Sequence, residues 1–258
     1  MRVPIATLLG LAGTAGEILR SYFDSGNNRV QKKADDSPVT DADMASNQFL
    51  VGELCKRFPY PVISEESHSN WAQALHSQAF WLLDPLDGTQ AFLSKSQEFS
   101  INLALMTKDG PKLGIIHAPM THEFWYAEHG KGAFYTTEGS SPQTLPMVFP
   151  PDCQIIKSRL NDEKEVSHWM QQNGFSKMRG ISSAIKFGQV AMGKASAYLR
   201  YAPSSEWDTA AGHVLVKESG GGMKMLSGKS DPTYLKQGFR NEAFIAFAKG
   251  VNCRGFRF

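Results

Sequence analysis

The stretch Phe80-Trp81-Leu82-Leu83-Asp84-Pro85-Leu86-Asp87-Gly88-Thr89 joins an apolar run to a short acidic turn. Its first four residues predict a buried strand, because a short apolar run bounded by turn residues is typical of strands covered on both faces. We expect the strand to break at Pro85 and the chain to turn at Gly88. Two carboxylates three residues apart, those of Asp84 and Asp87, therefore follow the end of a buried strand.

Carboxylates this close repel one another unless a cation lies between them. Asp84 and Asp87 therefore indicate a divalent-cation site, and hard oxygen ligands favour Mg²⁺ or Mn²⁺. Thr89 offers a hydroxyl beside such a cation, where it could hold a water for attack on a phosphate ester. Taken alone, residues 84–89 also fit an ordinary turn with both aspartates solvated.

The composition bounds the class of protein. The 258 residues suffice for one large domain or two closely packed ones, and 41% hydrophobic with 20% charged residues indicates a globular chain. The 27 basic and 25 acidic residues are interspersed and give a net charge of +2. No basic run predicts a nucleic-acid polymer as partner, whereas a small anionic substrate fits this balance. The sequence does not predict the oligomeric state.

The cysteines and the N-terminus predict the compartment. Cys55, Cys153 and Cys253 are far apart and form no CxxC pair, which favours free thiols in a reducing compartment. Apolar residues between 5 and 22 recur at helical spacing, which favours an amphipathic first helix over a signal peptide. No stretch is long enough to span a bilayer. We therefore expect a cytoplasmic protein, with a peripheral position on the inner membrane face as the alternative.

The remaining pattern divides the chain into two portions. In the first, helices are predicted at 5–22 and 40–58, and strands at 62–64, 80–83, 100–106, 113–117, 123–127 and 133–135. The last four strands form a meander, which predicts an antiparallel sheet. The second portion alternates strands at 154–157, 195–201 and 223–226 with helices at 162–173, 182–192 and 208–219, which favours an α/β unit. Residues 138–152 contain four prolines and are the predicted junction, so we expect an α+β portion at 1–137 and an α/β portion at 153–258.

Further acids lie where they could join the first two. Glu65 follows the strand at 62–64, and it reaches the same rim as Asp84 if the two strands are neighbours. Asp208 is predicted to begin a helix directly after Trp207, although simple N-capping is the alternative role for it, as it is for Asp43. A two-metal phosphatase needs several carboxylates around two cations, and Glu65, Asp84, Asp87 and Asp208 supply enough. The carbonyl of Leu86 could complete the set.

These motifs together resemble a known group of enzymes. The segments 63–67, 81–89 and 207–212 are similar in order and spacing to the signatures of the inositol monophosphatase-like superfamily. Within it the chain is most similar to the bacterial 3′(2′),5′-bisphosphate nucleotidases of the CysQ type, through residues 33–40, Asp43 and the segments 98–105, 182–187 and 207–213. The resemblance implies a layered αβαβα sandwich, an α+β and α/β fold in which the second portion closes the site.

The resemblance also implies a role for each matching residue. The metal ligands would be Glu65, Asp84, the Leu86 carbonyl, Asp87 and Asp208, holding two or three Mg²⁺ ions, with Mn²⁺ possible. Thr89 and Asp43 would orient and deprotonate the attacking water. The substrate contacts would come from Glu65, Leu86, Asp87, Gly88, Thr89 and Asp208, with Ser183, Lys186 and Arg200 reaching the 5′-phosphate or the ribose. A solvated helix face is the alternative interpretation of Lys186.

The activity implied by the resemblance is Mg²⁺-dependent hydrolysis of the 3′-phosphate of adenosine 3′,5′-bisphosphate to AMP and phosphate. In that family the reaction clears a by-product of sulfate assimilation, 3′-phosphoadenylyl sulfate is a second substrate, and Li⁺ inhibits. Gln90-Ala91 stands where these nucleotidases often have Lys-Glu, so the substrate preference stays open. Hydrolysis of inositol 1-phosphate or fructose 1,6-bisphosphate on the same fold is one alternative, and a non-catalytic regulator that binds metal or nucleotide is another.

Overall fold

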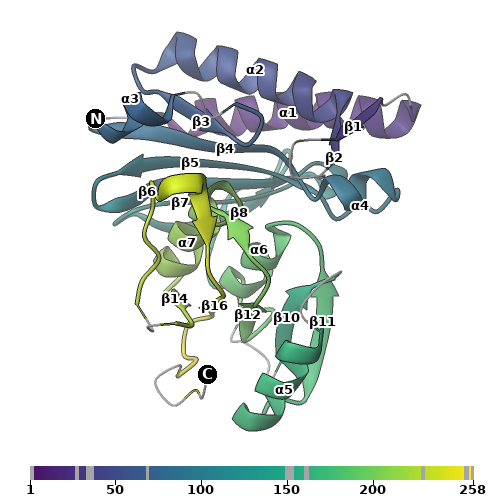
Figure 1. The fold of residues 1–258 in the computed structure, drawn as a ribbon, viewed down its shortest axis with the longest axis vertical. Helices are drawn as coiled ribbons and strands as arrows, with labels where there is room; N and C mark the ends of the chain where they lie inside the picture. The colour runs from purple at the N-terminus through teal and green to yellow at the C-terminus, as the bar shows by residue number, and fades with distance from the viewer. Residues whose placement is uncertain are drawn as a thin grey trace.

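Five layers alternate between helices and sheets in the computed structural model (Figure 1). It describes residues 3–26, 29–32, 38–67, 70–148, 154–159, 163–227, 230–252 and 256. Helices α1 (Ile5–Ser25) and α2 (Asp41–Arg57) cover one face of a seven-stranded sheet, and α6 (Ile185–Ala191) and α7 (Glu206–Glu218) cover the other. A five-stranded sheet lies beneath α6 and α7, and α5 (Glu163–Asn173) packs on its outer face. The predicted αβαβα layering is confirmed.

The seven-stranded sheet keeps its strands in chain order. The strands are β3 (Val62–Ser64), β4 (Ala79–Asp87), β5 (Ser100–Thr107), β6 (Gly110–Ala118), β7 (Glu123–Glu128), β8 (Gly132–Thr137) and β9 (Gln143–Thr144). β3 is parallel to β4, and every other pair is antiparallel. The predicted meander is therefore confirmed. Because β9 lies inside the segment predicted as the junction, that segment extends the first sheet, while the division into two portions stays a prediction.

Strand β4 is buried on both faces, as its apolar run predicts. Trp81 and Leu83 pack into the cluster beneath α1 and α2, whereas Phe80 and Leu82 pack into the cluster around α6 and α7. The expected break at Pro85 is wrong, because β4 continues to Asp87 with an irregular register after Asp84. β3 pairs with β4 only as far as Leu83, so the missing N–H of Pro85 interrupts no ladder on that side.

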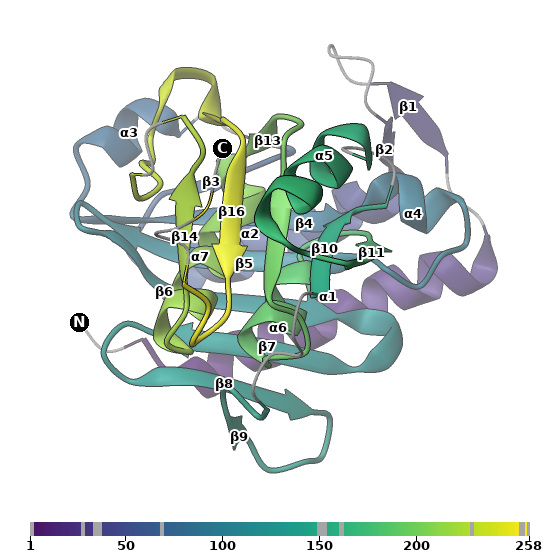
Figure 2. The same ribbon diagram turned by 90° about the horizontal axis from the view of Figure 1, so that it is seen from below.

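The five-stranded sheet is mixed. Its order is β11 (Lys177–Ile181), β10 (Gln154–Ser158), β12 (Ala197–Arg200), β16 (Phe244–Phe247) and β14 (Gly222–Met225). β10 is parallel to β11 and β12, whereas β16 is antiparallel to both of its neighbours. Its strands cross those of the large sheet steeply (Figure 2). The sequence predicted β10, β12 and β14 but assigned no strand to β11 or β16.

Short elements complete the described chain. They are β1 (Val30–Lys32), β2 (Pro38–Thr40), α3 (Trp71–Leu75), α4 (Thr89–Leu93), η1 (Pro119–Thr121), β13 (Ser204–Ser205), η2 (Gln237–Phe239) and β15 (Arg240–Asn241). No helix within the described ranges has the length and apolarity needed to cross a membrane. Cys55 is a free, exposed thiol, whereas Cys153, Cys253 and the motif residues 33–37 lie outside the described residues.

Two glycines allow α7 to pack closely against β6 and α6. A Cβ added to Gly114 of β6 would lie 2.6 Å from the carbonyl oxygen of Ala211 and 2.6 Å from Val214 Cγ1. A Cβ added to Gly212 would lie 2.2 Å from the ring of Phe187, so only glycine lets α6 approach α7 this closely. The position of α7, and with it that of Asp208, therefore depends on these two contacts.

Candidate active site

The paired ends of β3 and β4 bring the first two acids together. Ser64 pairs with Leu83, and the Glu65 N–H donates to the Leu83 carbonyl at 3.0 Å. Glu65 and Asp84 therefore leave the sheet at the same edge, as expected for neighbouring strands.

The irregular end of β4 fixes its two aspartates. Asp84 pairs with Asn102 and Asp87 with Ser100, so Pro85 and Leu86 bulge out between them. The Leu86 N–H donates to Asp84 Oδ1 at 3.0 Å, and Asn102 Nδ2 donates to Asp87 Oδ2 at 3.0 Å. The bulge re-aims the chain toward the cavity, a common function of such irregularities beside active sites.

Helix α2 braces the bulge from the opposite layer. Ser46 Oγ donates to the carbonyl of Pro85 at 2.9 Å, and both groups are buried. The neighbouring Leu86 carbonyl takes no part in this bond. It accepts a hydrogen bond from Thr89 Oγ1 at 3.3 Å.

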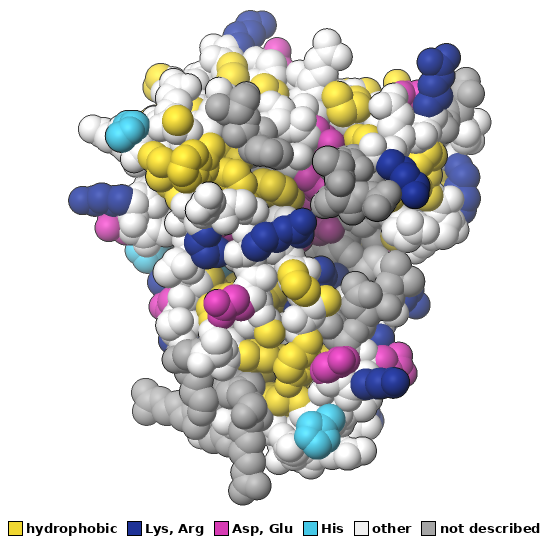
Figure 3. Space-filling view, in the orientation of Figure 1, with side chains coloured by type: hydrophobic (Ala, Val, Ile, Leu, Met, Phe, Trp, Pro, Cys, Tyr) yellow, Lys and Arg dark blue, Asp and Glu magenta, His cyan; other side chains and the backbone are white. Residues whose placement is uncertain are grey.

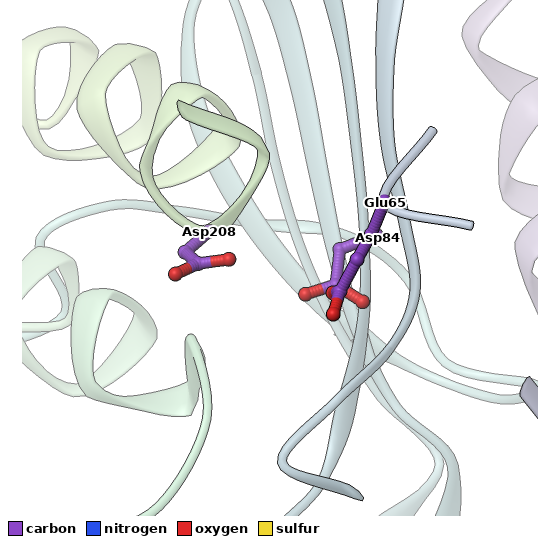
Figure 4. A group of neighbouring side chains, drawn as sticks. All are labelled: Glu65, Asp84 and Asp208. Atoms are coloured by element: carbon purple, nitrogen blue, oxygen red, sulfur yellow. The ribbon is translucent and has the colours of Figure 1, made fainter. Parts of the chain in front are cut away.

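Asp208 reaches the site from a different layer. α7 begins at Glu206, two residues before the predicted start, and Asp208 is the third residue of its first turn. Its Oδ2 accepts the Ser205 N–H at 2.9 Å, so Asp208 does cap the helix. One carboxylate oxygen each from Glu65, Asp84 and Asp208 nevertheless lie within 4.8 Å of one another. Figure 4 shows Asp208 facing Glu65 and Asp84 across the gap between α7 and β4.

The acidic cluster is electrostatically strained without a cation. Burial and the charges of Glu65, Asp87 and Asp208 raise the pKa of Asp84 well above its ordinary value. Burial and the charges of Asp87 and Glu65 likewise raise the pKa of Asp208, although Arg200 and the Ser205 N–H oppose this. A set of converging carboxylate oxygens is the ligand set that hard divalent cations take, so the residues fit such an ion.

Thr89 and Asp43, the predicted catalytic pair, are in contact. Thr40 donates its N–H and its hydroxyl to Asp43 Oδ2 at 2.8 and 2.6 Å, which caps α2. The other oxygen, Oδ1, accepts from Thr89 Oγ1 at 3.2 Å. Asp43 is only 1% exposed, so its carboxylate is held rigidly against the first residue of α4.

Gly88 makes the tight turn between β4 and α4. Its φ of 93° is a left-handed conformation that favours glycine. A Cβ added there would lie 3.2 Å from the Glu98 carbonyl and 3.4 Å from Ser183 Cβ. The turn therefore brings Ser183, from the second portion of the chain, next to Gly88.

A cavity of about 750 Å³ opens in front of the acids. Glu65, Asp84, Leu86, Asp87, Gly88, Thr89, Arg200 and Asp208, all predicted from the sequence, line it. Arg200 is held by bonds to the carbonyls of Ala202 and Pro203, at 3.0 and 2.9 Å.

Ser183 and Lys186 line a small adjoining cavity, which Asp87, Arg200 and Asp208 also border. Lys186 is 3% exposed, so it does not lie on a solvated helix face. Its Nζ donates to the Ser183 carbonyl, and burial lowers its pKa to about 8. α6 begins at Ile185 rather than at 182, because Ser183 has a φ of 54°.

One wall of the cavity was not predicted from the sequence. Gln237, Gly238, Phe239 and Arg240 line it, together with Trp71, Pro203, Ser204, Ser205 and Trp207. Glu206, which is fully buried, accepts the N–H groups of Leu235 and Lys236 at 2.7 and 2.9 Å and holds this loop. Glu206, directly before Trp207-Asp208, could have been noted as a residue that holds a loop. Nothing in residues 235–240 indicated that this loop forms a cavity wall.

Comparisons with known proteins identify the family and fold to which this chain is similar. The model of the inositol monophosphatase family matches residues 2–250 of this chain. The 3′(2′),5′-bisphosphate nucleotidase CysQ of Salmonella typhimurium strain LT2 is 36% identical over 236 residues, which cover 91% of this chain and 95% of that protein. The enzyme of the same name from Escherichia coli strain K12 is 35% identical over 236 residues, with the same coverage. The crystal structure of CysQ from Bacteroides thetaiotaomicron, a bacterial member of the same family, has a TM-score of 0.79 and 31% identity, and the match covers 93% of this chain and 94% of that one.

Proposed function

The chain belongs to the inositol monophosphatase family, and on this basis we propose that it is a divalent-cation-dependent 3′(2′),5′-bisphosphate nucleotidase. Its substrate would be adenosine 3′,5′-bisphosphate, and its products AMP and phosphate. The observation that carries the proposal is the convergence of Glu65, Asp84 and Asp208, from three elements, within 4.8 Å. The similarity to named nucleotidases over 91% of the chain supports the choice of substrate.

The carboxylates of Glu65, Asp84, Asp87 and Asp208, with the Leu86 carbonyl, would hold the cations. We propose Mg²⁺, because every one of these donors is a hard oxygen. Bound cations of this kind acidify water and stabilise charge on phosphoryl oxygens. Inhibition by Li⁺ stays a prediction that rests on the family resemblance.

The remaining residues of the site would position water and substrate. Thr89 Oγ1 would hold the attacking water. The proton of this water would pass toward Asp43 through the 3.2 Å hydrogen bond between Thr89 Oγ1 and Asp43 Oδ1. The water oxygen would bond to phosphorus while the bond from phosphorus to the 3′-oxygen breaks; the 3′-oxygen would take a proton from solvent water, and Asp43 would return its proton to solvent. The N–H groups of Gly88 and Thr89 would hold the phosphate during this step.

The second phosphate or the ribose would lie toward the basic side of the site. Arg200 borders both cavities, and Lys186 and Ser183 line the smaller one. We propose 3′-phosphoadenylyl sulfate as a further substrate on the same grounds. Residence in the cytoplasm also stays a proposal.

The test is phosphate release from adenosine 3′,5′-bisphosphate, inositol 1-phosphate and fructose 1,6-bisphosphate. Each is assayed with Mg²⁺, with EDTA, and with Asp87→Asn. Asp24→Asn, an exposed aspartate on α1, is the matched control. We expect Mg²⁺-dependent release that favours the nucleotide and is lost in Asp87→Asn alone. A preference for inositol or fructose phosphate would overturn the substrate, and cation binding without any release would favour the non-catalytic regulator.

A further inference from the structure

A second cavity of about 780 Å³ lies away from the acidic cluster and shares no lining residue with the main one. It is bordered by residues 75–78 before β4, by the β5–β6 turn at 107–112, by the C-terminal half of α7 and by residues 231–232. The main cavity lies at the C-terminal end of β4 and the N-terminal end of α7. The second cavity is therefore a separate space of similar size, to which the proposed function gives no role.

Unpaired lysines dominate the charge of this cavity. Lys108, Lys112 and Lys217 line it, and in the described part of the chain none of them forms an ion pair with an acid. Lys112 Nζ reaches only the carbonyl of His129, at 3.4 Å. The acids of the lining are Asp109 and Asp231.

The charge of Asp231 is already compensated from outside the lining. Lys224 Nζ lies 2.6 Å from Asp231 Oδ1. Glu218, which is not in the lining, accepts the N–H of Gly130 at 3.0 Å, and its other oxygen lies 3.0 Å from Nδ1 of His129 in the lining. The lining thus holds three lysines against two aspartates, of which Asp231 already pairs with Lys224.

A buried histidine adds a fixed polar group to the lining. His213 is 5% exposed, and its Nδ1 lies 2.8 Å from the hydroxyl of Tyr234. Burial lowers the pKa of His213 to about 4, so the ring is neutral at physiological pH. The Nε2 atom has no partner among the described residues, and it carries the ring proton in the tautomer in which the Tyr234 hydroxyl donates to Nδ1.

We propose that this second cavity binds a compact phosphate or sulfate dianion. The lysine ammonium groups supply charge, and an N–H of a nearly buried ring supplies a donor whose position is fixed by Tyr234. Such charge-assisted hydrogen bonds suit a small multivalent oxyanion. The cavity provides no aromatic wall for a nucleobase beyond its three histidines, so the oxyanion itself is the recognised group.

The test titrates the full chain with inorganic phosphate in EDTA, and measures binding by calorimetry. EDTA removes cations from the acidic cluster, so an anion at the main site could be held only by basic groups such as Arg200 and Lys186, and the lysine variants of the second cavity separate the two sites. We expect saturable binding at one site in the unmodified protein. The double variant Lys112→Gln/Lys217→Gln should bind at least about tenfold more weakly, and Lys56→Gln, an exposed lysine on α2 paired to Glu53, should bind normally.

Separate arms with sulfate and with a phosphate monoester distinguish the sources of the oxyanion. Tighter binding of the free ions than of the ester identifies an inorganic ligand, and the reverse identifies a phosphorylated metabolite. His213→Gln, which can keep an N–H near Nε2, should retain more affinity than His213→Leu. Circular dichroism confirms that each variant is folded, and Lys217 is exposed, so its substitution leaves the core intact.

Three results would overturn the proposal. They are the absence of saturable binding, equal affinity in the unmodified protein and the double lysine variant, and an equal loss in Lys56→Gln. Because no turnover is measured, these outcomes are independent of whether the nucleotidase activity exists.

Discussion

At the scale of single residues, the Asp84 carboxylate that would bind a cation lowers the stability of the metal-free protein. Its carboxylate is 1% exposed and faces three other acids, so its ionised form destabilises the metal-free fold. Because the pKa of Asp84 is higher in the folded than in the unfolded chain, the folded state binds more protons, and this contribution to stability falls as pH rises. Cations would reverse this penalty.

Asp84→Asn should therefore stabilise the metal-free protein while abolishing hydrolysis. The amide keeps an oxygen for the Leu86 N–H but removes one repelling charge. We expect the free energy of unfolding in EDTA at pH 8 to rise, because burial and the neighbouring acids penalise the ionised aspartate only in the folded state. Urea unfolding with EDTA and with Mg²⁺ measures this, and Mg²⁺ should stabilise the unmodified protein more than the variant. A variant that is less stable in EDTA would contradict the electrostatic explanation.

Thr89 offers a second test, on rate rather than stability. Thr89→Val removes the hydroxyl that contacts Asp43 but keeps the volume, whereas Thr89→Ser keeps the hydroxyl. We expect kcat to fall by about 10²- to 10⁴-fold in Thr89→Val, the range typical of lost general acid–base catalysis, with much of it retained in Thr89→Ser. Affinity for Mg²⁺, measured by calorimetry, should change little in either. Equal losses in both variants would show that the hydroxyl is not what matters.

At the scale of elements, the site depends on how closely α7 approaches the large sheet. Gly114→Ala would place a methyl group 2.6 Å from the Ala211 backbone oxygen, which cannot move without the helix. Asp208 lies on the same rigid helix, one turn before Ala211, so it must shift with it. We expect a loss of about 1–3 kcal/mol in unfolding free energy from overpacking and up to about 10²-fold in activity from the displaced carboxylate.

Gly52→Ala is the matched control. Gly52 lies on the exposed side of α2, and an added Cβ would meet nothing within 4 Å. There the change should raise stability by about 1 kcal/mol through helix propensity and leave the activity unaltered. If Gly114→Ala behaved like Gly52→Ala, the close approach of α7 would not position Asp208.

The elements also show what the sequence could and could not predict. Strands delivering Glu65 and Asp84 were predictable, because apolar runs ending in acids are local signals. β11 was not, since it has only five residues and Gly180 within it weakens the strand signal. β16 is a four-residue apolar run that pairs antiparallel between β12 and β14, and so short a run has no diagnostic period.

Residues fixed by long-range contacts were also beyond the sequence. The loop at 235–240 becomes a cavity wall only because Glu206 binds its backbone, across nearly thirty positions. Pro85 looked like a strand end because the sequence does not reveal that β3 stops pairing at Leu83. Local chemistry and the meander were therefore predictable, whereas the extent of the pairing between β3 and β4 and the contacts of Glu206 were not.

At the scale of the whole molecule, a buried histidine ties the outer helical layer to the large sheet. His117 of β6 is 2% exposed and stacks on Phe124 with ring centroids 3.9 Å apart, and its Nδ1 lies 3.0 Å from the Glu123 carbonyl. A Cβ on Gly16 of α1 would lie 2.3 Å from its Nε2, so the helix rests directly on the ring. Protonation of this ring would place a charge between two layers.

The global fold should consequently lose stability in mild acid through His117. Burial lowers the pKa of His117 to about 4, whereas the unfolded chain has the ordinary value of 6.5. Below pH 6.5 the unfolded state takes up the proton and the folded state does not, so unfolding becomes easier, by about 2 kcal/mol at pH 5 from this group. Urea unfolding of the unmodified protein and of His117→Gln, at pH 7.5 and pH 5 in EDTA, isolates the effect, because the acidic cluster contributes equally to both. His117→Gln should cost stability at pH 7.5, where the stacking is lost, yet lose about 2 kcal/mol less than the unmodified protein on going to pH 5. Parallel pH profiles for the two proteins would mean that His117 is protonated without opening the interface between α1 and the sheet.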